Sequence, residues 1–190
     1  MDKLDRKLKG IVAIWFPLAV SITLICGLIY LVAQQTIRLS ANSHQTEIAR
    51  DYAAILTNGQ DIKPLIPKRQ IDISQSLKTY VIIFDSNANL LFSSAFIDGK
   101  TPLPPKSVFD YVKTAGETKI TWQPKPGVRS AIVIDRFEGL HPGYILVGKS
   151  LKETELLEDK IFSIVSLAWI ASVAISFLAV AFSLKLASKK

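Results

Sequence analysis

The sequence predicts an α+β protein in which a long N-terminal helix and a five-stranded antiparallel sheet, with helices on one face, lie between two transmembrane helices. Three observations lead to this prediction. Two long runs, 11–33 and 161–184, contain no charged residue. Between them, five short segments rich in β-branched and aromatic residues are separated by turn residues. A helical pattern also continues outward from the first run as far as Thr57.

The first uncharged run is 23 residues long, which is enough for a membrane span. Gln34 and Gln35 follow it in place of the small residues of a cleavage site, so we expect the span to be retained. Basic residues cluster in 1–10 and 185–190, which places both ends in the cytoplasm and residues 34–160 outside. The chain has no N-glycosylation motif and one cysteine, Cys26, which we interpret as a lipid-facing or packing residue. We therefore expect the cytoplasmic (inner) membrane of a bacterium.

The charge distribution argues against a nucleic-acid partner. The net charge is +7, but the two ends account for +5, and residues 34–160 carry 16 basic and 14 acidic residues. His44 and His141 lie far apart in the sequence, without the short spacing of a zinc site. No catalytic or phosphate-binding motif is present, so we expect no enzyme activity, no metal and no cofactor.

The segment after the first span keeps a helical period. Its apolar stripe comprises Ile37, Ala41, His44, Ile48 and Ile55. The dipeptide at 58–59, Asn-Gly, is a typical helix end. We expect this helix to pack on the domain or on a second copy, and the protein to be a homodimer. For the histidine on the stripe we expect a packed or half-exposed residue, with a pH-sensing or ligand role as the alternative.

The middle of the chain supplies the strands. Pro64 and Pro67 indicate a loop, and 71–77 fits either alternation or a short helix. Segments 79–85 and 90–94 form a predicted hairpin around a Ser-Asn-Ala-Asn turn. A short helix then begins near Lys106 and ends before Gly116. Three further strands are predicted, at 118–123, 129–137 and 144–149.

The last strand leads into the second span. Ser150 and Glu153 have the spacing of a capping box, so we expect the exit helix to begin at Ser150 and to run to Leu184 without glycine or proline. These two residues are the predicted signal-transmission residues, because an unbroken helix would carry movement of the sheet to the membrane. Ala168, Ser172 and Ser176 form either a close-contact face or an ordinary run of small residues.

Four segments resemble a known family: YVIIFDSNANLLFSS (80–94), PPKSVFDYV (104–112), AIVIDRFEG (131–139) and YILVGKSLKETE (144–155). They are similar to the extracytoplasmic PAS-like sensor domain, also called Cache, of bacterial sensor histidine kinases and chemoreceptors. The resemblance covers nearly the whole chain as a pattern. It implies a PAS-like sheet that binds a small ligand or a periplasmic protein and moves the second span against the first.

Receptors of that family continue into a cytoplasmic linker and a kinase or signalling helix, whereas this sequence stops at Lys190. It is therefore either the N-terminal piece of a longer two-component receptor or a stand-alone sensor that acts through a partner. The rival hypothesis is a membrane-anchored structural or assembly protein whose outer domain docks a partner. A membrane-anchored enzyme is a remote third.

Polar and aromatic side chains on the predicted strands are the candidates for ligand binding: Tyr80, Trp122, Arg129, Asp135, Arg136 and Tyr144. Arg136 shares a strand face with Ile132 and Ile134, where a guanidinium is costly unless it is paired. Its partner is either a carboxylate of a ligand or a protein carboxylate in a strand-end salt bridge. For Trp122 the alternative to ligand contact is ordinary core packing.

Overall fold

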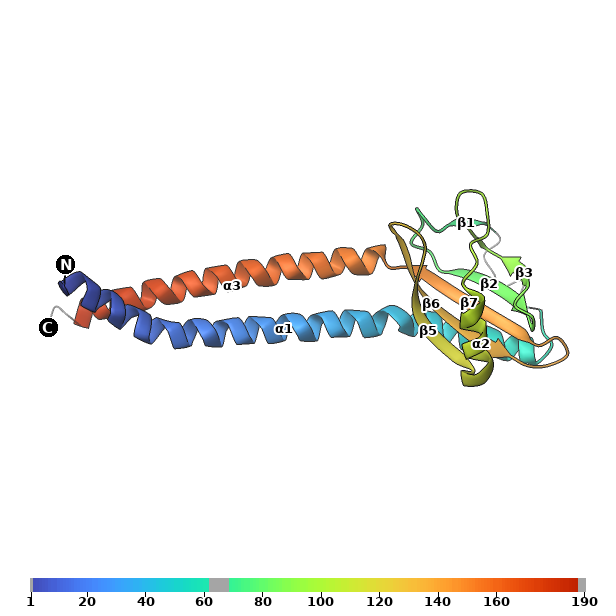
Figure 1. Cartoon of the computed structure of the whole chain (residues 1–190), viewed down its shortest axis with the longest axis horizontal. Coiled ribbons are helices and arrows are strands. Elements are labelled where there is room, and N and C mark those ends of the chain that lie inside the picture. Colours follow the sequence, from blue (N-terminus) through green and yellow to red (C-terminus); the bar gives the residue numbers. More distant parts are fainter. Residues whose placement is uncertain (1, 62–68, 188–190) are drawn as a thin grey trace. The chain divides into compact units, whose positions relative to one another are not determined.

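A computed structural model describes residues 2–61 and 69–187 (Figure 1). The chain divides into two compact units: residues 37–156, here called the sheet domain, and residues 1–36 with 157–190, here called the helix pair. The elements are α1 (Asp2–Thr57), β1 (Ile71–Asp72), β2 (Tyr80–Asp85), β3 (Leu90–Ser93), β4 (Ala95–Phe96), α2 (Lys106–Ala115), β5 (Glu117–Lys125), β6 (Val128–Phe137), β7 (Gly143–Ser150) and α3 (Lys152–Ala187).

The main sheet has five antiparallel strands, as the sequence predicted, and their order is β3-β2-β7-β6-β5. The predicted hairpin is confirmed, and Asp85 holds its turn because its Oδ1 accepts the amides of Asn87 and Asn89, each at 2.8 Å. Ala88 takes a φ of 61° in this turn. The three later strands form the expected meander, with β6 and β7 inside the sheet.

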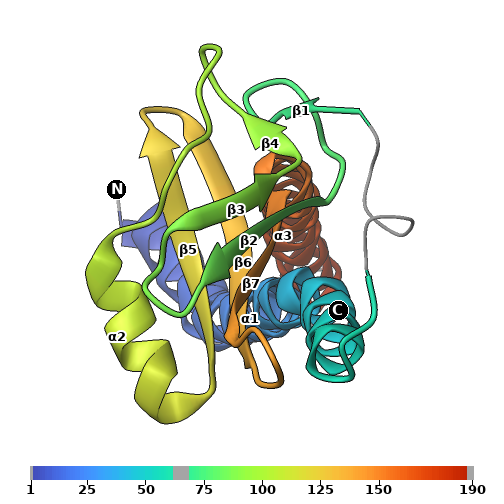
Figure 2. The same cartoon turned by 90° about the vertical axis from the view of Figure 1, so that its right-hand side faces the viewer.

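Helices cover both faces of the sheet, so the prediction that they lie on one face is wrong. Ala49 and Ala53 of α1 pack on one face, whereas Phe109 and Val112 of α2 pack on the other. Figure 2 shows α2 and the teal part of α1 on opposite sides of the strands. The run 144–147 is buried at every position, and a strand without alternation of buried and exposed residues is typical of a sheet covered on both sides.

The outer part of α1 packs on the sheet through part of the predicted stripe, Ile48 and Ile55, together with residues that the stripe did not include. Gln45, Ala49 and Ala53 are buried, whereas His44 is exposed, so of the two expectations for this histidine the packed one is wrong. The small side chains of Ala49 and Ala53 sit at the centre of this contact, and the larger Ile48 and Ile55 pack beside them, partly buried. The predicted helix end is confirmed: Gly59 has a φ of 71° and donates its amide to the Leu56 carbonyl at 3.0 Å.

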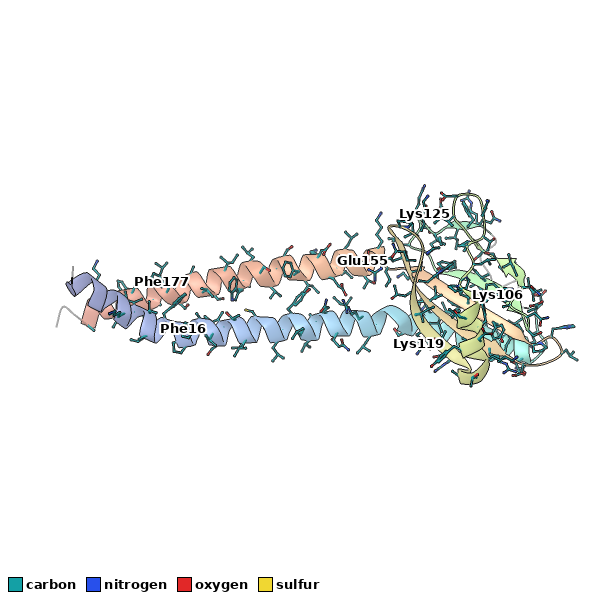
Figure 3. The ribbon with its side chains drawn as sticks, viewed as in Figure 1. Phe16, Lys106, Lys119, Lys125, Glu155 and Phe177 are labelled. Atoms are coloured by element: carbon teal, nitrogen blue, oxygen red, sulfur yellow. The ribbon has the colours of Figure 1, made fainter. Side chains whose placement is uncertain are left out.

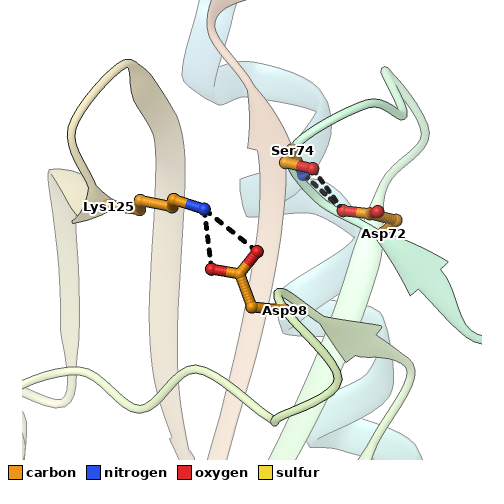
Figure 4. Close-up of polar contacts among 4 residues, drawn as sticks. All are labelled: Asp72, Ser74, Asp98 and Lys125. Carbon is orange, nitrogen blue, oxygen red and sulfur yellow. Dashed lines mark hydrogen bonds and ion pairs between the residues drawn. The ribbon is translucent and has the colours of Figure 1, made fainter.

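The segment after α1 adds a small sheet that the sequence did not predict. The loop indicated by Pro64 and Pro67 lies outside the described residues. Beyond it, β1 and β4 pair in parallel. Two carboxylates order the neighbouring turns (Figure 4): Asp72 Oδ1 accepts the Ser74 hydroxyl at 2.6 Å, and Lys125 Nζ contacts Asp98 at 2.7 and 3.0 Å. The Ser74 hydroxyl and amide lower the pKa of Asp72.

The exit helix begins later than predicted, and the capping box is wrong. Ser150 is the last residue of β7 and pairs with Ser130, so the sheet ladder holds it in an extended conformation. Its hydroxyl accepts the Lys152 amide at 3.3 Å, and the Glu153 carboxylate pairs with Lys149 instead of the Ser150 amide. The first helical bond runs from the Glu155 amide to the Leu151 carbonyl at 2.8 Å.

In the helix pair, α1 and α3 are long and apolar enough to cross a membrane, by length and composition alone. Figure 3 shows side chains along both helices, among them Phe16 and Phe177. Of the three small residues noted on α3, Ser176 contacts α1 through Trp15 at 3.1 Å, whereas Ala168 and Ser172 are exposed. The intrachain contact therefore does not follow that small-residue face.

Candidate functional site at the α3 end of the sheet

The residues predicted to form a site fall at two opposite ends of the sheet. At the end where β7 enters α3, here called the α3 end, the ladders align Trp122, Ser130 and Ser150, and Tyr80 pairs with Gly148. Arg129 and Glu153 belong to this end as well. Arg136 and Tyr144 pair with each other at the other end, about 20 Å away along β6 at roughly 3.3 Å per residue. The candidates therefore do not converge on one pocket.

At the end away from α3, Arg136 has partners within the protein. Its Nη1 donates to the Lys113 carbonyl at 3.0 Å, near the C-terminus of α2, and its Nη2 pairs with Glu138 at 2.8 Å. A cation at a helix C-terminus is favourable because the last carbonyls carry partial negative charge. Tyr144 is buried, with its ring 5.3 Å from that of Phe109. This geometry is the strand-end salt bridge, the alternative to ligand binding.

The α3 end ties the first turn of the exit helix to two strands. Arg129 of β6 pairs with Glu155 at 2.6 Å, and Lys149 of β7 pairs with Glu153 at 3.2 Å. The Leu151 amide also donates to the Arg129 carbonyl at 2.9 Å. Each ion pair is partly exposed and contributes at most about 1 kcal/mol. Together with the backbone bond they hold the first turn of α3 against β6 and β7.

Two buried hydroxyls lie beneath this junction. Tyr80 lies flat over Gly148: a Cβ added to that glycine would be 2.3 Å from the Tyr80 Cζ. The Tyr80 hydroxyl and the Ser130 Oγ are both buried, and within the described chain neither makes a hydrogen bond of normal geometry. Burial raises the pKa of Tyr80, and the Ser130 hydroxyl partly offsets this rise. Tyr80 therefore stays protonated at physiological pH. Trp122 is also buried and belongs to the apolar core on the sheet face that α2 covers. This position fits core packing.

A charged cluster on the α1 face was missed at the sequence level. Glu117 and Asp135 are direct partners on β5 and β6, and Glu117 pairs with Arg50 of α1 at 2.9 Å and with Lys119 at 3.2 Å. Burial and the Glu117 charge raise the pKa of Asp135. The predicted strand boundaries did not include the register between β5 and β6. Without that register, the sequence could not show that these two carboxylates lie side by side.

Beside this cluster, α1 and β5 line a groove of about 570 Å³ that includes Arg38, Arg50, Asp51 and Lys119. Both charge signs are present on its walls, so the groove selects no class of ligand by charge. Among the described residues, no three His, Cys, Asp or Glu side chains gather as a metal site. The α3 end consists of a strand, an ion-paired first turn and a helix without glycine or proline.

The chain was compared with protein-family models, curated proteins and solved structures, and none of them matched it.

Proposed function

We propose that the chain is a membrane-anchored sensory input module whose residues 34–160 lie outside the cytoplasmic membrane of a bacterium. In this proposal α1 and α3 are the two spans, and the sheet domain binds a small ligand or a partner protein. The change is passed to the cell interior through α3, as in the PAS-like sensor domains that the sequence resembles. In this proposal the protein transmits a conformational change and catalyses no reaction.

The junction between β7 and α3 is the observation that carries this proposal. One residue, Leu151, separates the strand from the helix, and α3 continues from Lys152 to Ala187 without glycine or proline. Glycine in a helix interior costs about 1 kcal/mol and adds freedom, so its absence keeps the helix stiff. The Arg129–Glu155 pair and the Lys149–Glu153 pair connect two inner strands of the sheet to this helix.

The proposal can be tested without a known ligand. The full chain is fused to a reporter kinase, and basal output is compared for the wild type, Arg129→Glu, and Arg129→Glu combined with Glu155→Arg. Reversing one charge repels the first turn of α3, so output should shift; the double swap restores the pair and should restore output. Replacing Leu156 and Leu157 by glycine adds a hinge and should abolish the shift.

Lys125→Glu provides a matched control, because the Lys125 side chain is as exposed as that of Arg129 and its ion pair with Asp98 does not involve α3. That change should leave output at the wild-type level. If Arg129→Glu and Lys125→Glu act alike, or if the glycine pair leaves the Arg129→Glu shift intact, α3 is a tether. The rival hypothesis of a docking or assembly protein would then be preferred.

A further inference from the structure

Two tryptophans of the helix pair form reciprocal hydrogen bonds. Trp15 of α1 donates its indole Nε1–H to Ser176 Oγ of α3 at 3.1 Å. Trp169 of α3 donates its Nε1–H to Thr23 Oγ1 of α1 at 2.9 Å. Each helix therefore supplies one indole donor and one hydroxyl acceptor to the other.

Each acceptor hydroxyl is oriented by its own helix. Thr23 donates its proton to the Ala19 carbonyl at 2.8 Å, and Ser176 donates to the Val173 carbonyl at 2.9 Å. With its single proton committed to its own helix, each oxygen turns lone pairs outward for the indole. Trp15 also shares its N–H with the Val173 carbonyl at 3.3 Å. Both hydroxyls therefore act as fixed acceptors.

Aromatic contacts repeat along the same line. Trp15 packs edge-on against Phe177 with ring centroids 5.5 Å apart, and Tyr30 packs edge-on against Phe162 at 5.6 Å. From Thr23 to Tyr30 the chain advances seven residues, and from Trp169 back to Phe162 it also moves seven. Such spacing is two turns of each helix, so all of these contacts require one antiparallel register.

The cost of losing the indole hydrogen bonds depends on whether water can replace their acceptors. If the two helices cross a membrane, as proposed above, Trp169 lies about 12 Å inside the uncharged run 161–184, at 1.5 Å per residue. At that depth no water is available to an N–H group. A slide of α3 along α1 by one turn, about 5.4 Å, would leave both indoles without their acceptors.

We propose that Trp15 and Trp169, with Ser176 and Thr23, form a clasp that fixes α3 against α1 of the same chain in one axial register. This inference rests on the membrane placement in the proposed function and adds a constraint to it. Movement of the sheet then reaches the cell interior through the clasped pair, and α3 does not slide by a turn along α1.

The native Cys26 provides a test, because it is partly buried and lies three residues after Thr23. The register places it opposite Ser166, three residues before Trp169 and also partly buried. In membranes containing the full chain, oxidation with copper phenanthroline should link Cys26 to Ser166→Cys within one chain. The exposed positions Ile170→Cys, one turn further along, and Ser172→Cys should give several-fold lower yields. Mass spectrometry identifies the linked peptides.

Removal of the acceptors tests the clasp itself. Thr23→Val with Ser176→Ala should lower the yield at Ser166→Cys several-fold and raise the yield at Ile170→Cys. The matched control is Ser21→Ala with Ser163→Ala, since these hydroxyls bond the Pro17 and Asp159 carbonyls of their own helices and are exposed. The control pair should change neither yield.

Three results would overturn the clasp: an unchanged cross-link pattern after loss of both acceptors, links formed between two chains, or no preference for position 166. The cross-link is measured whether or not the chain signals. A clasp that fails while Arg129→Glu still shifts reporter output leaves the proposed function standing. A confirmed clasp without any reporter response would instead count against the sensory proposal alone.

Discussion

The sheet domain and the helix pair place apolar side chains in opposite ways. In the domain, large residues such as Phe84, Ile132 and Leu146 are at most 1% exposed. In the described part of the helix pair, Val180 alone among the apolar side chains is buried, and leucines such as Leu24 and Leu28 are more than 60% exposed. The sheet domain thus buries its large apolar side chains in its own core, whereas the helix pair leaves most of its apolar side chains exposed.

This difference indicates what surrounds each unit. Monomeric soluble proteins rarely leave contiguous apolar surface larger than a few hundred Å². A helix that is apolar on all sides is stable where its neighbours are apolar as well, in a protein core or in a bilayer. The outward leucines of α1 and α3 therefore support the membrane placement proposed above.

Two leucines of similar exposure, one in each unit, should show the largest difference between these surroundings. Leu24 of α1 is 69% exposed and Leu91 of β3 is 63% exposed. An arginine at the centre of a span costs about 2.5–3.5 kcal/mol, so Leu24→Arg should markedly reduce the fraction of the protein recovered in membranes. Leu91 lies on the water-exposed edge strand β3, so Leu91→Arg should change the free energy of unfolding by less than about 0.5 kcal/mol. Equal membrane fractions for the two variants would remove the distinction between the units.

The domain interior should respond to a single methyl group. In Gly148→Ala the new Cβ would lie 2.3 Å from the Tyr80 ring, and Tyr80 is only 1% exposed. Overpacking of this kind costs about 1–3 kcal/mol, so the melting temperature of the detergent-solubilised full chain should fall. The second change Tyr80→Val, which removes the ring, should relieve most of this cost. Destabilisation that persists in the double variant would mean that the glycine is needed for another reason.

Two aspartates of the sheet domain should give smaller effects of opposite sign. Burial and Glu117 raise the pKa of Asp135 above its ordinary 3.8, so the protonated form favours folding. That stabilisation is present at low pH and is lost as pH rises through the folded pKa. Asp135→Asn should therefore raise the melting temperature at pH 7, and the gain should shrink towards pH 4.

Asp85 provides the contrast, because its hydrogen bonds with Asn89 and Asn87 lower its pKa. The charged form stabilises the turn above the ordinary pKa, and this contribution is lost as pH falls through the folded pKa. Asp85→Asn should lower the melting temperature at pH 7, and the loss should shrink as the solution is acidified. If the two variants shifted the melting temperature in the same direction at pH 7, at least one of these assignments would be wrong.

Local sequence signals predicted the five strands of the main sheet, the hairpin turn, α2 and the end of α1, because turn residues and β-rich runs act over a few positions. They did not predict the short strands β1 and β4. The continuously apolar run 144–147 was a signal for two covered faces, because a strand with one face in water alternates apolar and polar residues. The capping box failed at Ser150 because the ladder with Ser130 outweighs the local preference for a helix start.

The site was less predictable than the fold. Arg129 and Arg136 lie on the same strand, yet they serve opposite ends, and only the tertiary positions of Glu155 and Lys113 decide which partner each finds. Residue type showed that a guanidinium on a strand needs a partner. It did not show that the partner of Arg129 lies in the exit helix, the contact on which the proposed mechanism depends.

The central claim is that α1 and α3 anchor the sheet domain outside a membrane, and cysteine labelling in intact cells tests it most directly. In a Cys26→Ala background, single cysteines are placed at Asn58, at Lys100, and at Ser188, which lies outside the described residues. An impermeant maleimide should label Asn58→Cys and Lys100→Cys, and should label Ser188→Cys only after the membrane is permeabilised. Labelling of Ser188→Cys in intact cells, or protection of Lys100→Cys, would contradict the account.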